Sequence, residues 1–140
     1  MERWFEFMGN HPILFGILFV LAILFFGIEK KRSGKKVAPN ALGLLVNNEN
    51  ATLIDIRPAD KFATGHISGS RNIPFSELKS HVSELQALTT PIIFICDMGM
   101  QAGMAVQLIG KPNAMRLEGG IINYQSAGLP LITPKNKLKK

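Results

Sequence analysis

The only cysteine of this 140-residue chain, Cys96, stands where an apolar run ends and a short polar turn begins. The run, residues 91–95 (PIIFI), has the β-branched and aromatic character of a buried strand. The turn, residues 97–101 (DMGMQ), leads into a segment with helical spacing. Backbone N–H groups of such a turn and of a helix N-terminus can surround the sulfur and stabilise a thiolate or a persulfide. Cys96 is therefore a candidate for sulfur chemistry.

An inert structural cysteine is the other interpretation of Cys96. Free cysteine is among the most often buried residue types, and a small apolar residue at a strand end needs no further role. Gly99 is compatible with the chemical interpretation, because glycine permits the positive φ that so tight a turn requires. The turn by itself leaves both interpretations open.

The composition excludes several other kinds of site. A single cysteine excludes an internal disulfide, a CxxC redox pair and a cysteine-rich metal site. The three histidines, His11, His66 and His81, lack the spacing of metal ligands, and no glycine-rich phosphate-binding motif is present. We therefore expect neither a metal ion nor a cofactor.

The segments that must position Cys96 predict an α/β domain. The predicted strands cover residues 52–56, 91–95 and 114–117, with a short extended piece at 72–74. The predicted helices cover residues 40–46, 60–64, a stretch from about 76, 101–109 and 120–125. Asn40 is the expected cap of the first of these helices. Strands that alternate with helices predict a mostly parallel sheet covered on both faces, and Cys96 lies at a strand's C-terminal end, where such sheets bind ligands.

The N-terminal part has the composition of a membrane span. Residues 13–28 (ILFGILFVLAILFFGI) are all apolar, and a helix over 11–28 would be about 27 Å long. We expect Asn10 as its N-cap and Pro12 in its first turn. The aromatic residues before it suit the headgroup layer: Trp4, Phe5 and Phe7. A cleaved signal peptide is the alternative, but the acidic start and the lack of a small-residue cleavage site favour an uncleaved anchor.

The flanking charges predict the orientation of this span. The basic side chains that directly follow it are Lys30, Lys31, Arg32, Lys35 and Lys36, whereas Arg3 is the one Lys or Arg before it. The positive-inside rule then places the following domain in the cytoplasm. Residues 37–133 contain six basic and seven acidic side chains, so the net charge of +6 belongs to the flanks. Contact with anionic lipid headgroups or solvated chain ends, and not nucleic acid, is the expected role of these flanks.

Several motifs occur together in one order between residues 53 and 130. They are LIDIR at 53–57, FATGHISGS at 62–70, NIP at 72–74, PIIFIC at 91–96, LEGGI at 117–121, Tyr124 and GLP at 128–130. On these motifs residues 37–133 resemble a single-domain rhodanese, with Tyr124 where tryptophan is usual. The N-terminal anchor resembles that of a small bacterial subtype, which implies the inner membrane of a bacterium.

The resemblance implies a role for the cysteine loop. In that family the cysteine accepts a sulfane sulfur from a donor and passes it to a nucleophile. Cys96 is then the persulfide carrier, and its active-site loop consists of Asp97, Met98, Gly99, Met100 and Gln101. Asp55 and Arg57 flank a strand and His66 follows a turn glycine, so we expect all three to be structural support, the first two through hydrogen bonds or a salt bridge.

The loop departs from the pattern C-x-x-G-x-R-[ST] of active members. Gln101 replaces the arginine that would bind the donor's sulfonate, and Ala102 replaces the hydroxyl residue. Asp97 adds a carboxylate beside the thiol, which disfavours a thiolate and repels an anionic donor. Hydrogen bonds to charged groups contribute about 1.5–3 kcal/mol, so we expect weak or no activity with thiosulfate.

We expect five segments and leave two functions open. The segments are an interfacial stretch at 1–10, a transmembrane helix at 11–28, a basic linker at 29–36, the rhodanese-like domain at 37–133 and a basic tail at 134–140. One function is sulfur transfer through a Cys96 persulfide, from a donor and to an acceptor that the sequence does not name. The other is a catalytically degenerate domain that binds a partner, such as a membrane protein, through Met98, Met100 and Gln101.

Overall fold

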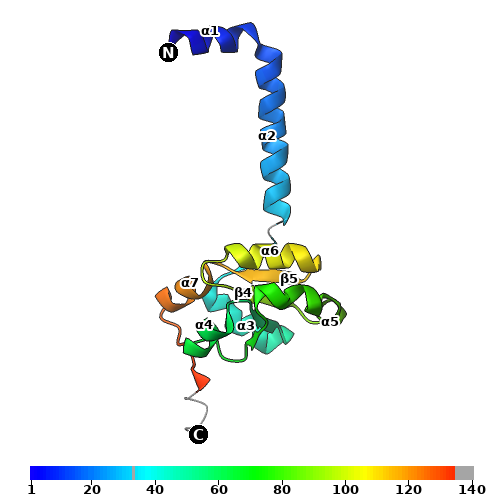
Figure 1. Ribbon diagram of the computed structural model, residues 1–140, viewed down its shortest axis with the longest axis vertical. Coiled ribbons are helices and arrows are strands. Elements are labelled where there is room, and N and C mark those ends of the chain that lie inside the picture. The colour runs from blue at the N-terminus through cyan, green and yellow to red at the C-terminus, as the bar shows by residue number, and fades with distance from the viewer. Residues whose placement is uncertain (33, 135–140) are drawn as a thin grey trace. The chain divides into compact units, whose positions relative to one another are not determined.

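The computed structural model describes residues 1–32 and 34–134 (Figure 1). The chain divides into two compact units, Met1–Arg32 and Ser33–Lys140. Each unit has its own internal contacts and is described by itself. The basic tail expected over 134–140 lies outside the described residues, apart from Pro134.

The first unit consists of two helices, α1 (Glu2–Asn10) and α2 (Pro12–Arg32). Asn10, predicted as the N-cap of the apolar helix, is instead the last residue of α1, because the residues before it form a helix of their own. Phe7 of α1 lies near the rings of His11 and Phe15, with centroid distances of 5.1 and 6.0 Å. The prediction of a cap at Asn10 is therefore wrong.

Among the residues described, α2 is the one helix that is long and apolar enough to cross a membrane, over Pro12–Lys31. Its 21 residues span about 31 Å at 1.5 Å per residue, which matches a bilayer's hydrocarbon core. Almost all its large apolar side chains are exposed. A membrane span and an N-terminal signal sequence share this length and composition.

The second unit is built on a five-stranded sheet with the order β1-β5-β4-β2-β3. The strands are β1 (Lys35–Val37), β2 (Thr52–Asp55), β3 (Arg71–Asn72), β4 (Ile92–Ile95) and β5 (Ala114–Leu117). Each of the pairings in this order is parallel. The predicted parallel sheet is thus confirmed, and the strand that leads to Cys96 lies at its centre.

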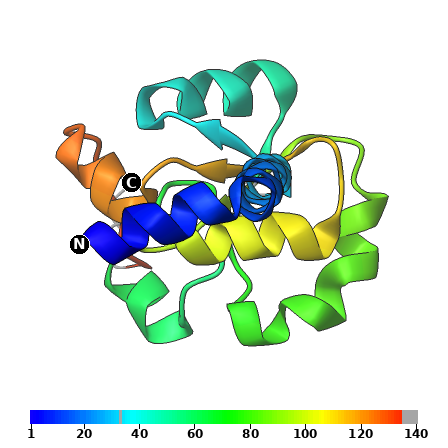
Figure 2. The same ribbon diagram turned by 90° about the horizontal axis from the view of Figure 1, so that it is seen from above.

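Helices cover both faces of the sheet. They are α3 (Pro39–Glu49), α4 (Ala59–Thr64), the 3-10 helix η1 (Phe75–His81), α5 (Val82–Ala87), α6 (Met100–Ile109) and α7 (Gly120–Ser126). Side chains of β4 alternate between two cores: Ile92 and Phe94 pack with residues of η1, α5 and α6, whereas Ile93 and Ile95 pack with residues of α3 and α7. Figure 2 shows α3 and α6 on opposite sides of the strands. This is the predicted α/β/α arrangement.

Two boundaries differ from the predictions. Residues 29–36, expected as a linker, instead complete α2 up to Arg32 and begin β1 at Lys35. A three-residue edge strand tolerates lysine, so no apolar run marks it in the sequence. Helix α3 begins at Pro39 after Ala38, which has extended backbone, so Asn40 lies inside its first turn and is not the cap. Proline is favoured at this first position because its φ is already helical.

Candidate functional site

Cys96 follows β4 directly, and its side chain is only 2% exposed. The Gly99 N–H donates a hydrogen bond to Cys96 Sγ across 2.9 Å. The alternation along β4 turns Cys96 toward the same core as Phe94 and Ala102. Helix α6 begins at Met100, so the connection consists of residues 97–99 and is shorter than predicted. The sequence predicts that several backbone N–H groups of this turn surround the sulfur. Within the described residues, the one that bonds to it is the N–H of Gly99.

Gly99 has the conformation that this tight connection requires. Its φ is +93°, in the left-handed region that residues with a Cβ rarely adopt. A Cβ at this position would lie 3.3 Å from the Gly119 nitrogen and 3.4 Å from the Leu117 oxygen. Gly99 therefore lets the chain turn from the strand into α6 while its N–H points at the sulfur.

The start of α7 holds the loop in place from the other side. The Ile121 N–H donates to the Cys96 carbonyl across 2.9 Å, and the Ile122 N–H donates to the Asp97 carbonyl across 3.2 Å. Gly120 permits this approach, because a Cβ there would lie 2.3 Å from the Cys96 oxygen. The second glycine of the GG pair is thus explained by backbone contact with the cysteine loop, whereas a Cβ at Gly119, whose φ is +67°, would lie 2.5 Å from the Asn123 Cβ.

Arg116 connects β5 to the same loop. Its Nη1 donates to the Gly99 carbonyl across 3.1 Å. Gly103 on α6 makes room for the guanidinium, since a Cβ at Gly103 would lie 3.1 Å from Arg116 Nη1. Gly99 therefore bonds to the cysteine sulfur through its N–H and to an arginine through its carbonyl.

Asp97 forms an ion pair at the surface next to Cys96. Lys61 Nζ of α4 lies 2.6 Å from Asp97 Oδ2, and the two side chains are 54% and 42% exposed. A pair this exposed contributes at most about 1 kcal/mol to stability. Its effect on the site is electrostatic, because the lysine offsets the carboxylate that the sequence places beside the thiol.

The remaining loop residues face outward. Met98 and Met100 are 65% and 75% exposed, and Gln101 is also exposed in the first turn of α6. Ala102, in contrast, is fully buried against the core. The loop thus presents two methionines and an amide at the protein surface around a buried sulfur.

Asp55, Arg57 and His66 form a buried polar cluster that supports the end of β2. Arg57 Nη2 lies 2.7 Å from Asp55 Oδ2 and donates to the Gly65 carbonyl across 2.8 Å. His66 is 4% exposed, pairs its backbone with Ile132, and has Nδ1 2.9 Å from the Phe62 carbonyl. The predicted ion pair is present, and these bonds of His66 run to backbone groups.

Three titratable groups away from the loop have altered pKa values. Burial raises the pKa of Tyr124 on α7. Hydrogen bonds from Arg71 and then from His81 lower the pKa of Glu84 to about 2. The same hydrogen bond with Glu84 raises the pKa of Arg71. Arg71, His81 and Glu84 thereby link β3, η1 and α5.

Sequence reasoning missed two basic residues near the loop, Arg116 and Lys61. Arg116 could have been recognised from the sequence, because it lies in the predicted strand 114–117. A charged side chain in a strand of a sheet covered on both faces is unusual and requires a partner. Nothing in the sequence pointed to Lys61, since it is one of several surface lysines and lies 36 residues from Asp97.

Comparison with known proteins agrees with this architecture. A family model described as the rhodanese-like domain matches residues 38–127. The uncharacterised protein YibN of Escherichia coli K12 is 32% identical over 143 residues, which cover 96% of this chain and 100% of YibN. The match with YibN therefore reaches into the N-terminal unit.

Two further similar proteins cover the second unit. The thiosulfate sulfurtransferase GlpE of Actinobacillus pleuropneumoniae serotype 3 is 26% identical over 101 residues, which cover 70% of this chain and 93% of GlpE. The crystal structure of a rhodanese-related protein from Thermoplasma volcanium is 25% identical, with a TM-score of 0.62, and covers 70% of this chain and 97% of that one.

Proposed function

Since the chain belongs to the family of rhodanese-like domains, we propose that it is a membrane-anchored sulfurtransferase that carries sulfane sulfur on Cys96. The observation that carries the proposal is the 2.9 Å hydrogen bond from the Gly99 N–H to Cys96 Sγ. A backbone N–H aimed at sulfur stabilises the negative charge of a thiolate and of the terminal sulfur of a persulfide. A sulfurtransferase among the relatives supports the same activity.

The proposed transfer has two steps. The Cys96 thiolate attacks the outer sulfur of a donor persulfide, R–S–SH, the donor S–S bond breaks, and the donor leaves as its thiol R–SH while Cys96 becomes a persulfide anion. An acceptor thiolate then attacks the outer sulfur of the Cys96 persulfide, which releases the Cys96 thiolate. The oxidation level of the sulfane sulfur is passed on, so no external oxidant or reductant is consumed.

The donor we propose is a persulfide and not thiosulfate. Gln101 offers no charge to a sulfonate, and Asp97 presents a carboxylate next to the loop. Lys61 offsets this carboxylate by a surface ion pair, which water and salt screen. A donor without a sulfonate group avoids both obstacles.

We propose that α2 is the anchor. It is exposed along its apolar length, and it is followed directly by basic residues that suit the cytoplasmic side. The inner membrane of a bacterium, with the second unit in the cytoplasm, is the location that these features favour.

The test is intact-mass analysis of the full chain in detergent after exposure to cysteine persulfide, glutathione persulfide or thiosulfate. We expect one added sulfur with at least one persulfide, removal of this sulfur by a reductant, and none with Cys96→Ser. Cys96→Ser should remain folded, because the exchange is nearly isosteric. Absence of added sulfur with every donor would reject the proposal, and unfolding of Cys96→Ser would favour a structural cysteine.

The second candidate function is a binding module without catalysis. It is favoured by the exposed methionines Met98 and Met100 beside a loop that lacks the family's arginine. Methionine is flexible and polarizable, which suits adaptable binding surfaces. A chain that takes up no sulfur but forms photocrosslinks from position 98 or 100 in native membranes would support this function.

A further inference from the structure

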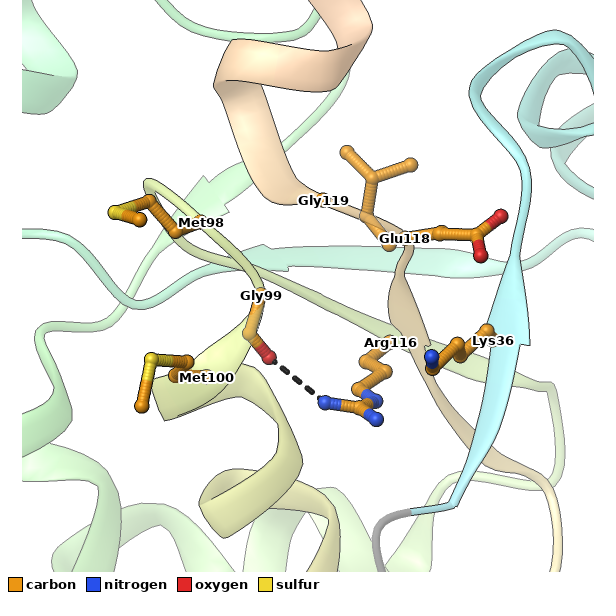
Figure 3. Close-up of a pocket in the computed structure, with 8 residues that line it drawn as sticks. Lys36, Met98, Gly99, Met100, Arg116, Glu118 and Gly119 are labelled. Carbon is orange, nitrogen blue, oxygen red and sulfur yellow. Dashed lines mark hydrogen bonds between the residues drawn. The ribbon is translucent and has the colours of Figure 1, made fainter.

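A small cavity lies between the cysteine loop and the edge of the sheet formed by β5 and β1. Its volume is about 110 Å³, and its lining includes Lys36, Met98, Gly99, Met100, Arg116 and Glu118 (Figure 3). We call it the β5 cavity. Cys96 does not line it, so it is separate from the sulfur site and its ligand need not be a sulfur donor.

Two cationic side chains converge in the β5 cavity. Lys36 of β1 and Arg116 of β5 are direct neighbours in the parallel register, so their side chains project from the same face of the sheet. Figure 3 shows their nitrogen-bearing ends close to each other below the loop. Among the described residues, no ion pair to a carboxylate is found for either of them. Like charges held together without a counter-ion favour an anion between them.

Arg116 has hydrogen-bonding capacity left for such an anion. A guanidinium has five N–H donors, and Nη1 bonds to the Gly99 carbonyl. The Nε donor is buried out of reach of solvent and has no hydrogen-bond partner within the described part of the chain, so the donors that can meet an anion in the cavity are the remaining N–H groups of Nη1 and Nη2. Glu118 also lines the cavity, but its carboxylate points away from the guanidinium in Figure 3. The lining therefore retains a net positive charge.

We propose that the β5 cavity binds a phosphate group. The fork of an arginine next to the point charge of a lysine is a pairing suited to phosphate oxygens. At about 30 Å³ for each water molecule, the cavity has room for between three and four waters, enough for one tetrahedral oxyanion.

The phosphate can belong to a soluble molecule or to a phospholipid headgroup. A phospholipid headgroup is a possible source because Lys36 is only four residues after Arg32, the last residue of the proposed anchor helix α2. Four extended residues span at most about 14 Å. The two sources present the same chemistry to Lys36 and Arg116, and the experiment separates them.

The first arm measures inorganic phosphate binding by calorimetry, with the full chain in dodecyl maltoside micelles, which contain no phosphate, at constant ionic strength. We expect saturable binding that is weakened about tenfold or more in Lys36→Gln, which removes one charged partner. Lys35→Gln is the matched control, since it removes the same charge one residue earlier, on the opposite face of β1. Phosphate binding by Lys35→Gln should stay within about twofold of that of the natural chain, because this variant loses only a longer-range electrostatic attraction that salt screens.

The second arm uses nanodiscs that contain phosphatidylglycerol and no added phosphate, and measures the rate of lysine acylation at positions 35 and 36 by mass spectrometry. Protection of Lys36 but not of Lys35 would identify a lipid headgroup as the ligand. Binding of inorganic phosphate in the first arm without protection of Lys36 in the second would identify a soluble phosphate, and either result supports the proposal. The proposal fails if neither arm gives a signal, or if Lys35→Gln loses as much binding as Lys36→Gln.

Discussion

Gly99 is the residue at which the parts of the site meet. Its N–H bonds to Cys96 Sγ and its carbonyl accepts from Arg116, so its conformation is fixed from both sides. We expect two neighbouring side chains, Asp97 and Gln101, to determine which sulfur donors can approach. Both are at the surface, and they can therefore be changed without disturbing the core.

Restoring the charge pattern of the family should restore thiosulfate activity. Gln101→Arg supplies a guanidinium at the first turn of α6, and Asp97→Asn removes the carboxylate and frees Lys61. We expect the double variant to transfer sulfur from thiosulfate at least about tenfold faster, since tenfold corresponds to about 1.4 kcal/mol, less than one charged hydrogen bond contributes. A coupled assay with cyanide as acceptor measures this rate.

Gln107→Arg is the matched control for this experiment. It adds the same charge at an exposed position of the same helix, further along α6. Its rate should equal that of the natural chain. A double variant that folds but remains inactive with thiosulfate would contradict this electrostatic account of donor choice. If it also takes up no sulfur from a persulfide, the binding module is favoured.

At the scale of elements, the cysteine loop depends on the start of α7. Gly120 has a φ of +63°, and a Cβ there would meet the Cys96 and Asp97 carbonyls at 2.3 and 2.5 Å. Backbone oxygens cannot move aside as a side chain can. The position of α7 and the position of the loop are therefore coupled.

Gly120→Ala should destabilise the second unit by about 3 kcal/mol or more, because overpacking and an unfavourable φ act together. Chemical denaturation followed by circular dichroism measures the free energy of unfolding. Gly43→Ala is the control: Gly43 lies inside α3, and a Cβ there would meet nothing within 4 Å, so this variant should gain up to about 1 kcal/mol. Similar stability of both variants would show that α7 does not constrain the loop.

The link between β3, η1 and α5 should give a pH-dependent contribution to stability. The pKa of Glu84 is lowered from 4.5 to about 2, first by the hydrogen bond from Arg71 and then by that from His81. A lowered pKa stabilises the folded state above the unfolded value, and this stabilisation is lost as the pH falls from 4.5 toward 2. Because the groups are exposed, the effect is small.

Glu84→Gln should thus lower the thermal midpoint at pH 7 by a few degrees or less, and this difference should shrink toward pH 2. Thermal scans across this pH range provide the measurement. Glu77→Gln removes a similarly exposed carboxylate from η1 and controls for net charge. The assigned ion pair would be contradicted if the difference in thermal midpoint between Glu84→Gln and the natural chain grew as the pH was lowered.

At the scale of the whole molecule, the chain joins an apolar helix to a domain that is nearly neutral. The basic residues between them divide into two groups. Lys30, Lys31 and Arg32 belong to α2, whereas Lys35 and Lys36 form part of the sheet. Orientation can therefore be tested with the first group alone, without altering β1.

We predict one crossing with the C-terminus in the cytoplasm. C-terminal fusions to a cytoplasm-dependent and to a periplasm-dependent reporter measure this, and activity of the periplasmic reporter would refute it. Changing Lys30, Lys31 and Arg32 to glutamine should produce a mixed orientation, because the bias between the flanks is reduced. The same change at Lys137, Lys139 and Lys140 is the control and should leave the orientation unchanged.

The sequence by itself determined the elements whose pattern is local. The β-branched runs of β2 and β4 were predicted correctly, because burial on both faces of a sheet requires continuous apolar residues. The apolar run of α2 was also predicted, because its length and composition alone indicate such a helix. Cys96 was placed at a strand end for the same reason. The sequence also determined that the family's arginine is absent, since Gln101 is visible without any structure.

Only the tertiary structure decided what lies beside the cysteine. Strand β1 was missed because two of its three residues are lysines at a sheet edge. The contacts of Gly99 with Arg116, of Asp97 with Lys61 and of Gly120 with the Cys96 carbonyl join residues 17 to 36 positions apart. Such contacts arise from the order in which the parallel strands lie side by side. No local pattern encodes that order, so the charges around the loop and the β5 cavity appear only when the chain is folded.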